Sequence, residues 1–140
     1  FHNPFPASIT GIPGHNVQII QLENIEITYP GRASKAQAYY SLSRLNDLPE
    51  KTRNYTEFTM FGELPAWGFY IRHASNIAFK NITLKLAGSD FRPSFVIDSA
   101  RHVTLSHIQL PTGYQDGQII LKDSPDYMIE ASGQLHGTVL

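Results

Sequence analysis

The chain has 12 acidic residues, and pairs of carboxylates are the groups with which glycoside-cleaving enzymes protonate a leaving oxygen and activate water. Glu23 and Glu26 flank a bend that we expect at Asn24, where side chains that are not apolar face solvent. An exposed pair of this kind offers no buried environment in which one carboxyl would stay protonated. The sequence therefore gives no reason to place a catalytic pair at this bend.

A second carboxylate, Asp98, closes a β-rich run, and the equivalent positions in the runs before and after it are Arg72 and Lys122. If these runs are neighbouring strands, the three side chains form a column of alternating charge. Such a column contributes a few tenths of a kcal/mol per pair when it is exposed. A structural charge ladder is the simplest interpretation of Asp98.

Histidine is the remaining residue type with catalytic or metal-binding potential, and the chain has 6 of them and no cysteine. No His-x-x-x-His or Glu-x-x-His spacing occurs. We therefore expect neither a metal site nor a cofactor. The lack of cysteine also excludes a disulfide scaffold.

Composition limits the classes of partner. Lysine and arginine total 11 against 12 acidic residues, so the net charge is -1 at pH 7. That balance argues against nucleic acid or an anionic membrane surface as a partner. No apolar stretch is long enough to span a bilayer, and 41% hydrophobic residues suffice for a core.

Short β-rich runs recur at intervals of about 25 residues. The first run of each copy begins at Phe69, Phe95 and Ile119. A second run follows, in which two apolar residues alternate, the spacing slips by one residue, and two more alternate. Its members are Ile20, Leu22, Ile25 and Ile27; Ile77, Phe79, Ile82 and Leu84; Val103, Leu105, Ile108 and Leu110; and, in a weaker copy, Tyr127 and Ile129.

A strand, a tight bend and another strand would place all four apolar side chains of a copy on one interior face. The bend positions read Asn24, Asn81 and His107, residue types that tolerate the left-handed backbone, and stacked amides there are expected to hydrogen-bond to one another. Copies that bury their inner faces only by stacking predict an all-β, right-handed parallel β-helix. A β-sandwich is the alternative, but it should show more two-residue Asn-Gly or Asp-Gly turns than Asp116-Gly117.

We expect residues 1–140 to form a single β-helix segment of about four coils, a size typical of one domain or part of one. The predicted coils are residues 8–30, 67–91, 92–116 and 117–135. A long loop insertion, residues 31–66, separates the first two coils. It is interpreted either as a flap over the coil or as the wall of a binding groove.

Four segments carry a resemblance to a known family. They are residues 9–15 (ITGIPGH), 22–25 (LENI), 60–73 (MFGELPAWGFYIRH) and 90–93 (DFRP). Together they resemble the later coils of family 28 glycoside hydrolases, the polygalacturonase-like enzymes of pectin breakdown, and most closely those of gut Bacteroidetes.

The resemblance implies a right-handed parallel β-helix that hydrolyses α-linked galacturonan or rhamnogalacturonan with inversion, in a secreted or periplasmic bacterial enzyme. The family's catalytic motifs are Asn-x-Asp, Asp-Asp, Gly-His-Gly and Arg-x-Lys, and none of them occurs in this chain. The nearest match is Gly14-His15-Asn16. No catalytic residue can be transferred, and we expect the chain to be a C-terminal fragment whose partners are the remaining N-terminal coils of the same enzyme.

Pectic galacturonan is a polyanion, so the resemblance also implies cationic groups along a sugar groove. Arg72, His73 and Arg92 are the candidates, together with Lys122 from the charge column. The structural alternative for these candidates is the ladder with Asp98 or a salt bridge to Asp90 or Glu63. Trp67 and Tyr70 are candidates for stacking on sugar rings, or else they pack a loop against the coil.

The expected function is therefore that of a scaffold and partial sugar groove within a pectin hydrolase, with catalysis in the complete enzyme. One alternative of another class is a non-catalytic β-helix that binds polysaccharide or acts as a spacer. A third is a pectate-type lyase, which shares the fold and needs a calcium site of aspartates together with a basic residue. The sequence leaves open which pectic backbone is involved and whether attack is internal or terminal.

Overall fold

A computed structural model describes residues 7–12, 14–30, 66–88, 90–111, 118–133 and 135–140 of the chain. These residues form seven strands, all in one parallel sheet system, and contain no helix. The strands are β1 (Ala7–Thr10), β2 (Val17–Tyr29), β3 (Phe69–Leu86), β4 (Phe95–Gln109), β5 (Ile119–Lys122), β6 (Tyr127–Glu130) and β7 (Gly137–Val139). The prediction of an all-β chain is confirmed. In the described residues no helix is long and apolar enough to cross a membrane.

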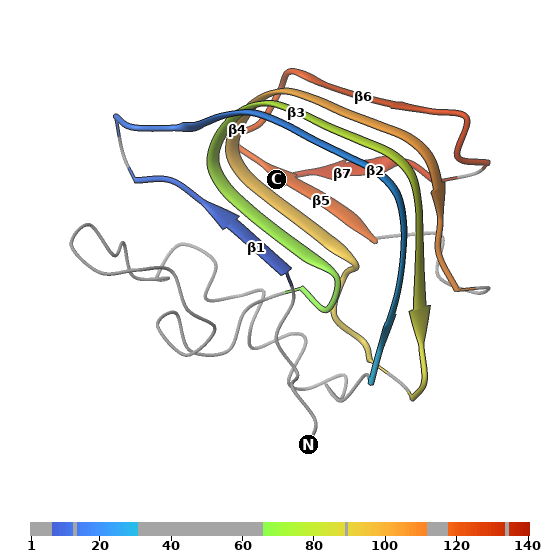
Figure 1. The fold of residues 1–140 in the computed structure, drawn as a ribbon. Helices are drawn as coiled ribbons and strands as arrows, with labels where there is room; N and C mark the ends of the chain where they lie inside the picture. The colour runs from blue at the N-terminus through green and yellow to red at the C-terminus, as the bar shows by residue number, and fades with distance from the viewer. Residues whose placement is uncertain (1–6, 13, 31–65, 89, 112–117, 134) are drawn as a thin grey trace.

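Strand pairing follows the repeat. Phe69 of β3 pairs with Phe95 of β4, which pairs with Ile119 of β5. In the second run, Ile20 of β2 pairs with Ile77, which pairs with Val103. The predicted alignment of copies is thus the observed register. Figure 1 looks along the stack, so β3 and β4 follow one another closely and bend around the same interior.

Each long strand bends where the backbone enters the left-handed region. Bends recur at stacked positions, which are His73, Ser99 and Asp123; Ile19, Asn76 and His102; and Asn24, Asn81, His107 and Ala131. At the third bend, the Asn81 side-chain amide donates to the Asn24 side-chain oxygen at 2.7 Å, as predicted. His107 does not continue this pattern, because its Nδ1 lies 2.9 Å from Ser106 Oγ.

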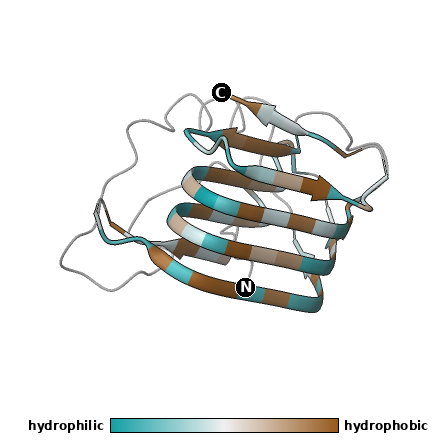
Figure 2. Cartoon of the chain, turned by 90° about the horizontal axis from the view of Figure 1, so that it is seen from above, coloured by the Kyte–Doolittle hydropathy of each residue, from teal (hydrophilic) through white to brown (hydrophobic). Residues whose placement is uncertain are grey.

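Inward side chains of the stacked strands form one apolar core. The rings of Phe69 and Phe95 stack with centroids 5.3 Å apart, and Phe79 meets both rings edge-on, at 5.1 Å and 5.4 Å. Figure 2 shows the rungs of the stack side by side, with hydrophobic and hydrophilic residues alternating along them. Period-two alternation along each rung directs one set of residues inward. The left-handed residue at each bend interrupts this alternation, which explains the slip in spacing there.

The parallel sheet does not close on itself. Its strand order is β1-β3-β4-β5-β7, while β2 pairs β3 and β6 pairs β4. The short strand β7 continues the stack beyond residue 135, where the last predicted coil ends. Of the predicted insertion 31–66, only Ala66 falls within the described residues, and it is buried. The flap and groove-wall hypotheses for that insertion lie outside the described residues.

Candidate functional site

Strands β3, β4 and β5 carry a column of charged residues on the face opposite the core. Phe69 and Ile71 belong to the core cluster, so strand alternation sends Arg72 and its partners to the other face. Asp98 lies between two cations, with Arg72 Nε 3.6 Å from one carboxylate oxygen and Lys122 Nζ 3.7 Å from the other. The predicted charge ladder is confirmed.

Asp98 is only 2% exposed, although it is charged. Besides its two cations, it accepts a hydrogen bond from Ser99 Oγ at 2.9 Å. Lys122 also contacts Asp123, with Nζ 2.9 Å from Oδ2, and this hydrogen bond is the main reason that the pKa of Lys122 lies above its usual value. The charges of this column therefore neutralise one another to a large extent before any ligand arrives.

Arg92 forms a second ion pair, and this pair is buried. Its Nη2 lies 2.8 Å from Asp90 Oδ2, and its Nε donates to Asp90 Oδ1 at 3.0 Å. The Arg92 backbone N–H donates to the same Oδ1 at 3.1 Å. The arginine is 1% exposed and the aspartate 0%. Arg92 thus fixes the turn before β4, and the salt bridge proposed as its structural alternative is present.

The two aromatic candidates for sugar stacking are both buried. Trp67 packs edge-on against Tyr29, with ring centroids 5.5 Å apart, and its indole nitrogen finds no hydrogen-bond partner among the described residues. Tyr70 is fully buried on the face opposite the core, in register with Val96. Neither ring offers a surface on which a sugar could stack.

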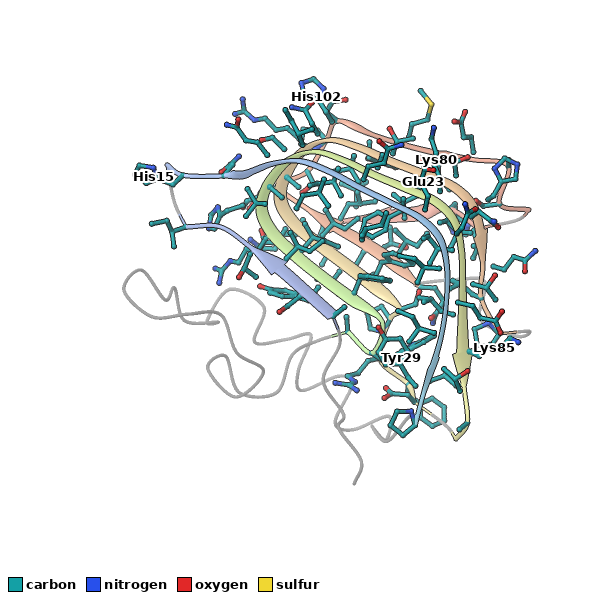
Figure 3. The ribbon with its side chains drawn as sticks, viewed as in Figure 1. His15, Glu23, Tyr29, Lys80, Lys85 and His102 are labelled. Atoms are coloured by element: carbon teal, nitrogen blue, oxygen red, sulfur yellow. The ribbon has the colours of Figure 1, made fainter. Side chains whose placement is uncertain are left out.

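Tyr29 is a residue whose role the sequence did not reveal. Its hydroxyl donates a hydrogen bond to the Gly68 carbonyl at 2.8 Å and so ties the end of β2 to the start of β3. Burial raises the pKa of Tyr29 to about 12, although the Ala7 backbone acts in the opposite direction. Figure 3 shows Tyr29 near the end of its strand, well apart from His15 and His102.

His73 occupies the first bend of β3, where its φ is 53° and its side chain is half-buried. Gly11 passes directly beside it, since a Cβ at Gly11 would lie 2.5 Å from the His73 carbonyl oxygen. This close approach explains a glycine in the ITGIPGH segment. Of the five predicted site residues, Arg72 and His73 are adjacent at this corner and partly accessible, whereas Trp67, Tyr70 and Arg92 are buried.

A further pair at the corner was missed from sequence. His102 Nδ1 lies 2.6 Å from Asp126 Oδ2, and both side chains are largely exposed. The signal was available, because Val103 pairs with Tyr127, so the residues just before them are neighbours on adjacent coils. In the part of the chain that the structure describes, no three histidine or carboxylate side chains gather as a metal site would require.

The described carboxylates thus fall into two sets. Asp90 and Asp98 are buried and ion-paired, and the others, such as Glu26 and Asp126, are exposed. Arg72 and Lys122 keep part of their side chains exposed beside Asp98, and the residues described show no acid–base pair of the kind that hydrolysis needs. Comparison of the chain with family models, curated proteins and solved structures finds no match.

Proposed function

We propose that this chain is the C-terminal section of a pectin-degrading glycoside hydrolase of the polygalacturonase type. The observation that carries the proposal is the resemblance of residues 60–73 and 9–15 to the later coils of family 28. The in-register parallel stacking of β2, β3 and β4 supports it, because that is the arrangement such coils require. In this proposal catalysis belongs to other coils, and the enzyme acts outside the cytoplasm.

The proposed path of the chain is a right-handed parallel β-helix. Two features support it: every pairing between named strands is parallel, and equivalent bends recur in successive coils. Connections between parallel strands of one sheet are right-handed in about 98% of cases. Each coil here returns to pair in register with the coil before it, so the same constraint applies.

The proposed contribution of this section to the sugar groove centres on Arg72 and Lys122. Both lie on the face opposite the core and keep some exposed surface, 11% and 21% of their side chains. A galacturonate carboxylate would share these cations with Asp98, so each contact adds only modestly to affinity. His73 lies at the same corner, with its side chain half-buried. Trp67, Tyr70 and Arg92 are buried and have no part in the proposed groove.

The direct test is reducing-sugar release from polygalacturonate by a polypeptide that carries these coils together with the proposed preceding ones, compared with this chain alone. We expect the longer polypeptide to be active and the chain alone to be inactive. Release of unsaturated products would instead indicate a lyase. Failure of the longer polypeptide to cut any pectic polymer would refute the enzymatic proposal.

A second candidate function is a non-catalytic module that binds polysaccharide or acts as a spacer. The observation in its favour is that the buried charges are already paired within the chain, as Arg92 with Asp90 and Arg72 and Lys122 with Asp98. Affinity electrophoresis in gels that contain polygalacturonate measures whether the chain binds the polymer, independently of hydrolysis. Strong retardation without any hydrolysis by the longer polypeptide would favour the binding module.

A further inference from the structure

Among the described strands, none pairs with the outer edge of β2. Within the described residues β2 pairs with β3 alone, whereas β3 pairs on both sides, with β1 and β2 on one and β4 on the other. The inward residues of the two strands differ in burial accordingly. Leu22 and Ile25 of β2 are half-buried, while their partners Phe79 and Ile82 in β3 are 0% exposed.

The charges on this edge are of one sign. Glu23 and Glu26 are the only charged residues of β2, and both are exposed. On its paired side β2 meets bases: Lys80 is in register with Glu23, and Lys85 Nζ lies 2.6 Å from Glu26 Oε1. Figure 3 shows Lys80 beside Glu23 on the outer face of the stack. Basic residues on a strand at the open side would therefore pair favourably with these glutamates as well.

An amide also remains available at this edge. Asn24 accepts the hydrogen bond from Asn81 with its side-chain oxygen, and no described residue accepts from the Asn24 side-chain nitrogen. A neighbouring strand with asparagine in this column would continue the same bond. The amide, like the charges, thus has a partner on one side and an open position on the other.

Ile19 supplies an independent observation on the same strand. It has a φ of 57° and is 80% exposed, although it is β-branched and apolar. Its equivalents in the next two coils are Asn76 and His102, which suit a left-handed bend far better. Ile19 is therefore a strained apolar residue that no described residue covers.

A second copy of the chain does not fit this edge. Stacked head to tail, its last strand would bring Glu130 next to Glu23, because Glu23, Lys80, Ser106 and Glu130 share one column. Stacked head to head, two copies of β2 would bring four glutamates together along one seam. Like charges on directly opposed strands are destabilising, so the charges disfavour self-association in both orientations.

We propose that the free edge of β2 binds a parallel β-strand that carries lysine or arginine beside Glu23 and Glu26 and asparagine beside Asn24. The strand is a coil of the longer solenoid, an assignment that rests on the proposed function. Backbone hydrogen bonds supply most of the affinity, the apolar residues cover the half-buried interior of β2, and the two basic residues fix the register.

The test uses a peptide whose chemistry the structure provides. Residues 74–86 of β3 already pair with β2 in this register, so an N-acetylated, C-amidated, fluorescein-labelled copy of that segment is the probe. Its control carries glutamate at the positions of Lys80 and Lys85. We expect the lysine peptide to bind the 140-residue chain about tenfold more tightly at low salt. The preference should shrink at high salt.

Matched variants of the chain identify the edge. Glu23→Gln with Glu26→Gln should remove most of the discrimination between the peptides, while leaving the paired edge without new like charges. Glu130→Gln, in the same column at the opposite end of the stack, should leave it unchanged. Hydrogen exchange should show new protection of β2 amides in the presence of the lysine peptide.

The proposal would be overturned by no binding of the lysine peptide, by equal binding of both peptides, or by discrimination that depends on Glu130 instead of Glu23 and Glu26. Protection of β2 that grows with chain concentration alone would also overturn it, because a second copy would then be the occupant. The peptide experiment contains no polysaccharide. Absence of pectin hydrolysis together with intact peptide discrimination would therefore refute the proposed function and leave the docking edge standing.

Discussion

Strands β2 and β3 share the same pattern of apolar residues, yet their residues contribute differently to the stability of the fold. The two strands pair in register from Val17 with Ala74 to Tyr29 with Leu86. Phe79 lies against aromatic rings on two coils, whereas Leu22, its partner in β2, has a described neighbour on one side only. In a stacked fold, the contribution of a residue to stability therefore depends more on the number of coils packed against it than on its own hydrophobicity.

The largest expected effect is in the interior coil. Phe79→Ala removes a ring that contacts Phe69 and Phe95, and it should lower the free energy of unfolding by about 4 kcal/mol. Leu22→Ala at the equivalent position of β2 should cost about half as much or less, because that side chain is only half-buried. Urea denaturation of both variants measures the difference. Equal losses of stability in the two variants would contradict the proposed difference between β2 and β3.

The next test compares a buried ion pair with an exposed one. Arg92→Ala leaves Asp90 buried without its cation and should destabilise the fold by about 3 kcal/mol. Lys85→Ala removes the exposed partner of Glu26 and should cost less than about 1 kcal/mol. Arg92→Ala combined with Asp90→Ala should recover part of the loss. If the double variant is no better than the single one, the stranded charge is not the cause.

Alkaline pH tests the half-buried end of β2, where Tyr29 lies. The pKa of Tyr29 is about 12 in the folded chain against an ordinary 10, so the folded state keeps a proton that the unfolded state releases. This contribution to stability is complete below pH 10 and is lost as the pH rises from about 10 to about 12. Tyr29→Phe should lose about 1 kcal/mol at neutral pH, because the bond to Gly68 is gone.

Stability curves of wild type and Tyr29→Phe between pH 9 and about 12 provide the measurement, and the variant should show the shallower decline. Parallel curves would mean that the Tyr29 hydroxyl is as accessible in the folded chain as in the unfolded one.

The smallest expected effect is that of exchanging isoleucine and asparagine at the second bend, which should stabilise β2 and destabilise β3. Ile19→Asn should stabilise the chain by about 1 kcal/mol, because asparagine tolerates the left-handed backbone and Ile19 is exposed. Asn76→Ile, at the equivalent bend of β3, should destabilise by a similar amount. Thermal unfolding of the two variants decides the matter. Destabilisation by Ile19→Asn would show that the isoleucine makes a contact within the chain.

The register of the fold could be predicted from sequence because stacking requires the same residue class at the same place in each coil. Ile20, Ile77 and Val103 repeat for this reason, as do Asn24 and Asn81 at their bend. The strand β7 escaped prediction, since Gly137–Val139 is too short to show a period. A repeat also carries no information on handedness, which depends on how the chain returns between coils.

The candidate site was harder to predict because residue type does not reveal burial. Arg92 looks like a ligand for a sugar acid until its geometry with Asp90 is known. Trp67 looks like a sugar platform until its packing against Tyr29 is known. Arg72 and Lys122 were identified by the repeat itself, since the positions that align in sequence are those that stack around Asp98.

The central claim, that these coils belong to a pectin hydrolase, is tested most directly by the stereochemistry of its first product. A polypeptide that carries these coils and the proposed preceding ones should be mixed with α-linked galacturonan and followed by proton NMR from the first minutes. We expect new reducing ends to form first in the β configuration, because the proposed hydrolysis inverts the anomeric carbon. First formation of the α anomer, of an unsaturated product or of no product would contradict the claim.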